Sequence, residues 1–286
     1  MRHYFLYIIV LLAACSRDEK TIKIKGSDTE VNLAVRLAES FHQVNPTVFV
    51  SISGGGSGLG IAALLNGTAD IANSSRTINT GELQLFESRR HEIDSFIFAQ
   101  DAIAIVVAAD LGIDSISPGD LADIFSGKST NWSHFGATKK RINIYGRQSN
   151  SGTHDFIKKK LGINFTPYAK QMNGNAQIIE AVKADHSGIG YVGAGYVSHK
   201  QARDIKVLPI YLEKRENAIS PFDSSMIAEG RYFFQRPLFQ YYKSISYDKI
   251  KPFLDFEKSD AGQKIIQLSG YYPVKSTHEY QGEGKN

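Results

Sequence analysis

The sequence predicts an α/β fold made of two lobes that are joined by two crossing strands. From residue 21 onward, strand-like apolar runs alternate with helix-like stretches, an alternation typical of parallel α/β layers. Two long apolar segments, "DAIAIVVAAD" and "FFQRPLFQYYK", enclose a further set of strands and helices. The enclosed block predicts a second lobe, which gives lobe I as 23–100 plus 238–286 and lobe II as 101–237.

The elements of lobe I can be taken in chain order. "TIKIKG" predicts a strand, and "TEVNLAVRLAESFHQVNP" predicts an amphipathic helix that Pro46 stops. "TVFVSIS" predicts a strand, "GIAALLNG" a short helix and "ADIANSS" a further strand. In lobe II, "RINIY" is strand-like and "HDFIKKKLG" is helix-like. We expect the aromatic stripe "YFFQRPLFQYY" to pack the lobes.

The first 14 residues have the layout of a signal peptide, with a basic residue, an apolar run and small residues. The run is shorter than the roughly 20 residues that a spanning helix needs. "LAAC", ending at Cys15, resembles the lipobox of bacterial lipoproteins. It predicts cleavage before Cys15, acylation (palmitate), a lipidated tether over 15–22 and an extracytoplasmic protein held at a membrane. A free cysteine beside a plain cleavage site is the alternative.

Three polar clusters, "GSDTE", "SGGGSG" and "NSSR", each follow a predicted strand of lobe I. Ligands of parallel α/β sheets bind beyond the carboxyl ends of the strands, so these clusters are expected to meet at one edge. The glycine-rich cluster opens a helix, where free N–H groups and the helix dipole attract anions. Glycine lets an anion approach the backbone closely. The sequence therefore predicts an anion site here, with a tight turn that binds nothing as the alternative.

Several other chemistries do not fit the sequence. A P-loop needs a lysine and a hydroxyl residue after its second glycine, but Ile61 and Ala62 follow Gly60. The glycine spacing also fails the dinucleotide fingerprint and the serine nucleophile elbow. Cys15 is the single cysteine, the eight histidines show no close ligand spacing, and the net charge of +4 is mild. We expect no cofactor, no metal, no nucleic-acid partner and no enzymatic activity.

A second anion signal lies in "GRQSNSGTHDF". Ser151, Gly152 and Thr153 are predicted to form a helix N-terminus whose hydroxyl and N–H donors point outward. Arg147 stands at the end of the preceding strand, and its guanidinium suits an oxyanion because it stays charged and carries five fixed donors. An ordinary helix cap is the alternative for the three-residue motif.

Six segments together, "KGSDTE", "SGGGSGLGIAALLNGTADIANSSR", "IFSGKSTNW", "GRQSNSGT", "GIGYVGAGYV" and "GYYPV", resemble the PstS-like phosphate-binding proteins of bacterial ABC importers. The resemblance covers nearly the whole mature chain in the family's order. It implies the two-lobed type II periplasmic-binding-protein fold, a monomer that closes on one dehydrated phosphate, and delivery to permease subunits. The alternatives are another oxyanion, such as sulfate, molybdate or tungstate, and a phosphate-ester hydrolase or sensor that uses the same cradle.

The resemblance also implies which residues bind phosphate. They are Thr29, the Glu30 N–H group, Ser57, Ser75, Arg147, Ser151, Gly152 and Thr153. Ser75 stands where some members carry a carboxylate that accepts the phosphate's proton. Asp28 is the nearest candidate for that acceptor by sequence, and capping of the helix that begins at "TEVNLAV" is its alternative role.

Overall fold

The computed structural model describes residues 21–197 and 204–274. The predicted signal peptide, Cys15 and most of the predicted tether lie outside the described residues. The first strand, β1 (Thr21–Gly26), begins inside the range predicted as tether, because Ile22 is buried in the core. Among the residues that are described, no helix has the length and apolar character needed to cross a bilayer.

Lobe I is built on one sheet in the order β2-β1-β3-β9-β4. Its strands are β1, β2 (Phe49–Ser53), β3 (Ile71–Ser74), β9 (Gln235–Lys243) and β4 (Ile93–Ala108), with the short β10 (Tyr272–Pro273) beside β4. The first three strands are parallel, whereas β9 is antiparallel to both of its neighbours. The carboxyl ends of β1, β2 and β3 therefore meet at one edge, as predicted.

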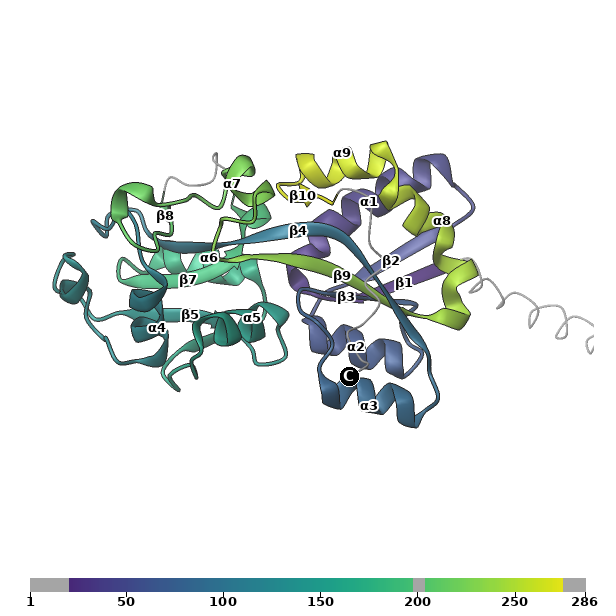
Figure 1. Cartoon of the computed structure of the whole chain (residues 1–286), viewed down its shortest axis with the longest axis horizontal. Coiled ribbons are helices and arrows are strands. Elements are labelled where there is room, and N and C mark those ends of the chain that lie inside the picture. Colours follow the sequence, from purple (N-terminus) through teal and green to yellow (C-terminus); the bar gives the residue numbers. More distant parts are fainter. Residues whose placement is uncertain (1–20, 198–203, 275–286) are drawn as a thin grey trace, which may run out of the picture.

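Helices cover both faces of the lobe I sheet (Figure 1). They are α1 (Val31–Val44), α8 (Tyr247–Lys258) and α9 (Asp260–Leu268) on one face, and α2 (Ser57–Leu65) and α3 (Thr80–Ser88) on the other. Helix α1 buries Leu33, Leu37 and Phe41 at helical spacing, which is why the amphipathic pattern forms a helix here. It ends at Val44, before Pro46, as predicted.

Lobe II has its own sheet, in which β4 continues between β7 (Gly188–Gly193) and β8 (Ile205–Leu208). Parallel strands β5 (Asn143–Arg147) and β6 (Lys170–Met172) extend it beyond β7. Its helices are α4 (Pro118–Ser126), α5 (Gly152–Leu161), α6 (Asn175–Ala184) and α7 (Ser224–Ala228). Within 21–197 and 204–274 there are also five short 3-10 helices: η2 (Asp28–Glu30), η3 (Trp132–Phe135), η4 (Ala194–Tyr196), η5 (Arg215–Asn217) and η6 (Ser244–Ser246).

Strands β4 and β9 run side by side from one lobe to the other (Figure 1). Each lobe has its own buried hydrophobic residues. The predicted aromatic stripe contributes to the cores of both, with Tyr232 and Phe234 before β9 in lobe II and residues of β9 in lobe I. The predicted two-lobed α/β fold with two connecting strands is therefore confirmed. The boundaries at 100/101 and 237/238 stay a prediction, because both strands pass through these points without a break.

Candidate functional site

Hydroxyl groups from both lobes meet at the carboxyl edge of the lobe I sheet. The Ser27 hydroxyl donates to the Ser75 Oγ at 3.0 Å, and the Ser57 and Ser75 Oγ atoms lie 3.4 Å apart. Across the lobes, the Oγ1 atoms of Thr29 and Thr153 are 3.1 Å apart. All five side chains are buried. We call these five residues the hydroxyl cluster; four of them were predicted from the sequence, and Ser27 was not.

The N-terminus of α5 approaches this cluster closely. Ser151 is the N-cap of α5, and its Oγ accepts from the Thr153 N–H group at 3.2 Å. A Cβ atom on Gly152 would lie 2.4 Å from the Ser57 Oγ and 2.5 Å from the Ser75 Oγ. Such contacts are far shorter than van der Waals distances, so the approach of the two lobes depends on glycine at this position.

The glycine-rich loop makes backbone contacts that its sequence did not predict, and its role as an anion site stays a prediction. The Gly56 N–H donates to the Gly26 carbonyl at 2.9 Å, and the Gly58 N–H donates to the Asn150 carbonyl of lobe II at 3.1 Å. A Cβ atom on Gly60 would lie 2.5 Å from the Lys25 carbonyl oxygen. Two N–H groups of this loop therefore bind protein carbonyls, and the glycines also serve close packing of α2 on β1.

Arg147 ends β5, where its own N–H donates to the Tyr191 hydroxyl. Its guanidinium is buried, with Nη1 donating to the Asp28 Oδ2 at 3.3 Å and Nη2 to the Asn173 carbonyl at 2.9 Å. The Arg147 Nε has no hydrogen-bond partner among the described residues. Burial lowers the pKa of Arg147, and the Asp28 carboxylate opposes that shift. The arginine thus reaches across the cleft to lobe I, and its Nε–H group is without a partner among the described residues.

Asp28 connects the lobes rather than capping its own helix. Its Oδ2 also accepts from the N–H group of Asn175 at 2.8 Å and from the Asn175 Nδ2 at 2.7 Å, at the start of α6. Neither η2 nor α1 has a side-chain cap. The predicted capping role is wrong, because η2 precedes α1 and α1 starts only at Val31. The role of proton acceptor stays a prediction.

Glu30 was predicted to offer its backbone N–H, which here donates to the Ser27 carbonyl at 3.4 Å. Its side chain is fully buried, and neither carboxyl oxygen has a hydrogen-bond partner among the described residues. Burial raises the pKa of Glu30 well above its usual range, although the Arg236 guanidinium opposes the rise. The carboxyl group is thus favoured in its protonated form inside the fold.

Replacing Glu30 by glutamine is expected to make stability less dependent on pH. A carboxyl group with a raised pKa in the folded state contributes stability below its unfolded pKa, near 4.5, and loses it as the pH rises towards the folded value. Glutamine does not ionise, so Glu30→Gln should raise the melting temperature at about pH 8 but not at about pH 4. Thermal melts of both proteins at the two pH values test this; an equal shift at both would contradict it.

Sequence reasoning missed a buried ion pair beside the hydroxyl cluster. Arg236 of β9 and Asp101 of β4 are cross-strand partners. The Arg236 Nε and Nη2 atoms donate to the Asp101 Oδ2 at 3.1 and 2.9 Å. Both residues lie within long apolar strands, and a charge buried in such a strand needs a partner. A charged residue within each apolar strand was therefore the available sequence signal. Which residue pairs with which follows only from the register of β4 against β9.

Two tyrosines hold the backbone of η2 in place. The Tyr196 hydroxyl of η4 donates to the Asp28 carbonyl at 2.6 Å, and the Tyr271 hydroxyl donates to the Thr29 carbonyl. Tyr196 belongs to the segment "GIGYVGAGYV" and Tyr271 to "GYYPV". These two segments therefore act on the site through the backbone of 28–29.

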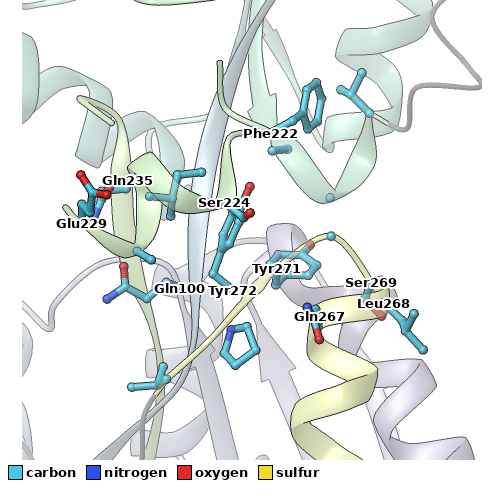
Figure 2. Close-up of a pocket in the computed structure, with 18 of the residues that line it drawn as sticks. Gln100, Phe222, Ser224, Glu229, Gln235, Gln267, Leu268, Ser269, Tyr271 and Tyr272 are labelled. Carbon is cyan, nitrogen blue, oxygen red and sulfur yellow. The ribbon is translucent and has the colours of Figure 1, made fainter. Parts of the chain in front are cut away.

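In the described part of the chain, two large grooves lie between the lobes, besides a smaller one of about 380 Å³ that Ser75 and Arg236 line. One of about 1100 Å³ opens beside Asp28 and is lined by Gly54 and Gly55 of lobe I and by Asn173 and Tyr196 of lobe II. Asp28, which pairs with Arg147, lines this groove, whereas the five residues of the hydroxyl cluster do not. Figure 2 shows the other groove, of about 1010 Å³, where Tyr271 lies among residues from α9, β10 and α7. None of the predicted site residues lines this second groove.

Comparisons with known proteins agree with this geometry. Residues 13–261 match the model of a family described as a PBP superfamily domain. The phosphate-binding protein PstS of Pseudomonas aeruginosa is 30% identical over 269 residues, which covers 87% of this chain and 81% of that protein. This chain belongs to the PstS-like family. The PstS-like assignment made from the six sequence segments is therefore confirmed.

Solved structures support the PstS-like fold. An ABC-type phosphate transport receptor from Vibrio cholerae is 28% identical, with a TM-score of 0.70 over 88% of this chain and 100% of that chain. A phosphate ABC transporter substrate-binding protein from Clostridium perfringens, solved with bound phosphate, has a TM-score of 0.80 over 89% of this chain and 100% of that chain. Since it is only 24% identical, this second likeness shows the fold alone.

Proposed function

We propose that this chain binds inorganic phosphate between its two lobes and delivers it to the permease subunits of an ABC importer. The observation that supports this most is the meeting of buried hydroxyl donors from both lobes, with Thr29, Ser57 and Ser75 from lobe I and Thr153 from lobe II. The buried guanidinium of Arg147 contacts Asp28, the neighbour of Thr29 in the chain. Such donors can replace the water around an oxyanion, and a guanidinium adds a charge-assisted bond. Membership of the PstS-like family supports phosphate as the oxyanion.

The ligand set that we propose is the one that the sequence resemblance implies. The hydroxyls of Thr29, Ser57, Ser75, Ser151 and Thr153, the N–H groups of Glu30 and Gly152, and the guanidinium of Arg147 form this set. Asp28 is the proposed acceptor of the phosphate's proton. Its Oδ2 takes three donors, whereas no hydrogen bond to its Oδ1 is found among the described residues. That oxygen is the one available to a protonated anion.

We also propose a role in binding rather than in catalysis. A serine nucleophile needs a base that takes its proton. In the described part of the chain, the Ser57 hydroxyl meets the Ser75 hydroxyl and the Ser75 N–H group, and Ser75 meets Ser27. These partners are hydroxyl and N–H groups, which can donate hydrogen bonds to an anion but do not act as a base. Incubation with a chromogenic phosphate ester should release no dye above a buffer control, and turnover by the purified protein would refute a purely binding role.

Asp28→Asn is expected to relax the discrimination between phosphate and sulfate. Monohydrogen phosphate carries a proton and sulfate does not, so a carboxylate acceptor binds the first and repels the second. Equilibrium dialysis with labelled phosphate, competed by sulfate, arsenate and molybdate, measures this. We expect arsenate to compete well with the wild type, sulfate and molybdate to compete poorly, and sulfate to improve about tenfold in Asp28→Asn.

Two outcomes of this competition would contradict the proposals. An identical sulfate inhibition constant in both proteins would remove Asp28 as the acceptor. Displacement of phosphate from the wild type by sulfate or molybdate at lower concentrations than unlabelled phosphate would assign the site to another oxyanion.

The proposed location is the extracytoplasmic face of a membrane, where a lipid on Cys15 anchors a monomer. Cys15→Ser is expected to release the protein from membranes and to leave phosphate affinity unchanged, because the anchor precedes β1 and is separate from the site. Membrane fractionation and dialysis of the same preparations test both parts. A serine variant that still sediments with membranes would overturn the anchor.

A further inference from the structure

Arg236 contacts the proposed phosphate cradle from the side of the connecting strands. Its Nη2 donates to the Thr29 Oγ1 at 3.2 Å and to the Thr153 Oγ1 at 3.0 Å. Its Nη1 donates to the Ser75 carbonyl at 3.1 Å. The side chain of Arg236 is buried, and its guanidinium contacts proposed ligands from both lobes. They are Thr29 and Ser75 of lobe I and Thr153 of lobe II.

These contacts fix the direction in which the two threonine hydroxyls donate. A hydroxyl group has one donor hydrogen and two acceptor lone pairs. Because Arg236 carries only donors, the oxygens of Thr29 and Thr153 must use lone pairs toward it, and their hydrogens point elsewhere. One of these hydrogens is shared between the two threonine oxygens, which lie 3.1 Å apart. The other hydroxyl is left to donate to an anion, and the first can donate to it only when the contact between the threonines opens.

The charge of Arg236 is balanced by Asp101, which is also fully buried. Asp101 uses only its Oδ2 toward Arg236, and its Oδ1 has no hydrogen-bond partner among the described residues. Glu30 and the Asp28–Arg147 pair also act on this part of the site. Arg76, Asp155, Lys159 and Lys160 line the groove that Arg236 lines. Glu30 is favoured as the neutral acid and the Asp28–Arg147 pair is internally balanced. The negative charge of Asp101 therefore offsets the attraction that Arg236 exerts on an anion at the proposed phosphate site.

We propose that Arg236 is a positioning residue of the phosphate site, which orients the hydroxyls of Thr29 and Thr153 as donors, and that Asp101 limits the attraction of its charge for the anion. This inference rests on the proposed function. It predicts that substitutions of the two partners change binding in opposite directions. A purely structural ion pair predicts the same direction for both, because either substitution leaves one buried charge unpaired.

The test compares phosphate affinity in the wild type, Asp101→Asn, Arg236→Lys, Arg236→Gln and the double variant Asp101→Asn/Arg236→Gln. We expect Asp101→Asn to bind phosphate at least about threefold more tightly, since a positive charge is left uncompensated. Arg236→Gln and the double variant should bind at least about tenfold more weakly, with Arg236→Lys between them and the wild type. Circular dichroism of each preparation shows whether it is folded.

The double variant keeps the test decisive if a single variant does not fold, because it leaves no buried charge unpaired. Weaker binding by a folded double variant supports the positioning role. Affinity within threefold of the wild type in that variant would overturn it, and so would weaker phosphate binding by a folded Asp101→Asn protein. If the wild type itself does not bind phosphate, the proposed function fails instead, so the two failures are distinguishable.

Discussion

Arg147→Ala is expected to weaken phosphate binding by about 30-fold or more. The guanidinium is buried, comes from lobe II and contacts lobe I through Asp28. Loss of a charged donor in a closed cleft costs about 2–5 kcal/mol, and each 1.4 kcal/mol corresponds to about tenfold in affinity. Calorimetric titration of the variant with phosphate measures the change, and circular dichroism checks the fold.

Two further variants show whether the loss of affinity in Arg147→Ala depends on the shape of the guanidinium and on its position. Arg147→Lys should recover only part of the affinity, since lysine keeps the charge but lacks the planar fork. Arg89→Ala is the matched control, because Arg89 lies at the end of α3 and donates to Asn66 within lobe I. Arg89→Ala should bind as the wild type does. An unchanged dissociation constant in Arg147→Ala would place the anion elsewhere.

Gly152→Ala is expected to reduce phosphate binding by at least about 100-fold while leaving each lobe folded. Alanine is favoured over glycine inside helices, so α5 itself should not suffer. The added Cβ would instead collide with the hydroxyls of Ser57 and Ser75, at 2.4 and 2.5 Å. The N-terminus of α5 would have to withdraw, and with it the donors of lobe II.

Gly119→Ala provides the control for this variant. Gly119 is also near the start of a lobe II helix, but a Cβ there would meet only the Ser117 Oγ at 3.7 Å, an ordinary contact. We expect it to bind phosphate like the wild type. Equal affinity of Gly152→Ala and Gly119→Ala would show that the close approach of α5 to lobe I is not needed for binding.

Local patterns were enough to predict much of the fold. Alternating strand and helix runs predicted β1 to β3 with α1 and α2, and the long apolar runs predicted β4 and β9 as connecting strands. The prediction of "TIKIKG" as a strand matches β1. The predicted tether nevertheless includes Ile22, and only packing reveals that this residue belongs to the core. Boundaries within β4 and β9 have no local signal because both strands are continuous.

The candidate site was predictable where it depends on single loops. The residues after β1, at the start of α2, after β3 and at the start of α5 were chosen from sequence, and four of their hydroxyls lie in the hydroxyl cluster. Relations between distant segments were not predictable. The pairing of Asp101 with Arg236 depends on strand register, and the contact of Asp28 with α6 depends on how the lobes meet.

The central claim is that one phosphate binds between the lobes and is held by donors from both. Calorimetric titration of the mature chain with phosphate, repeated with the Arg147→Ala and Gly152→Ala variants of lobe II and with Ser57→Ala of lobe I, tests it most directly. We predict one phosphate per wild-type chain and weaker binding in all three variants. Saturable binding that none of these substitutions weakens would contradict the claim, and so would a wild-type chain that does not bind phosphate.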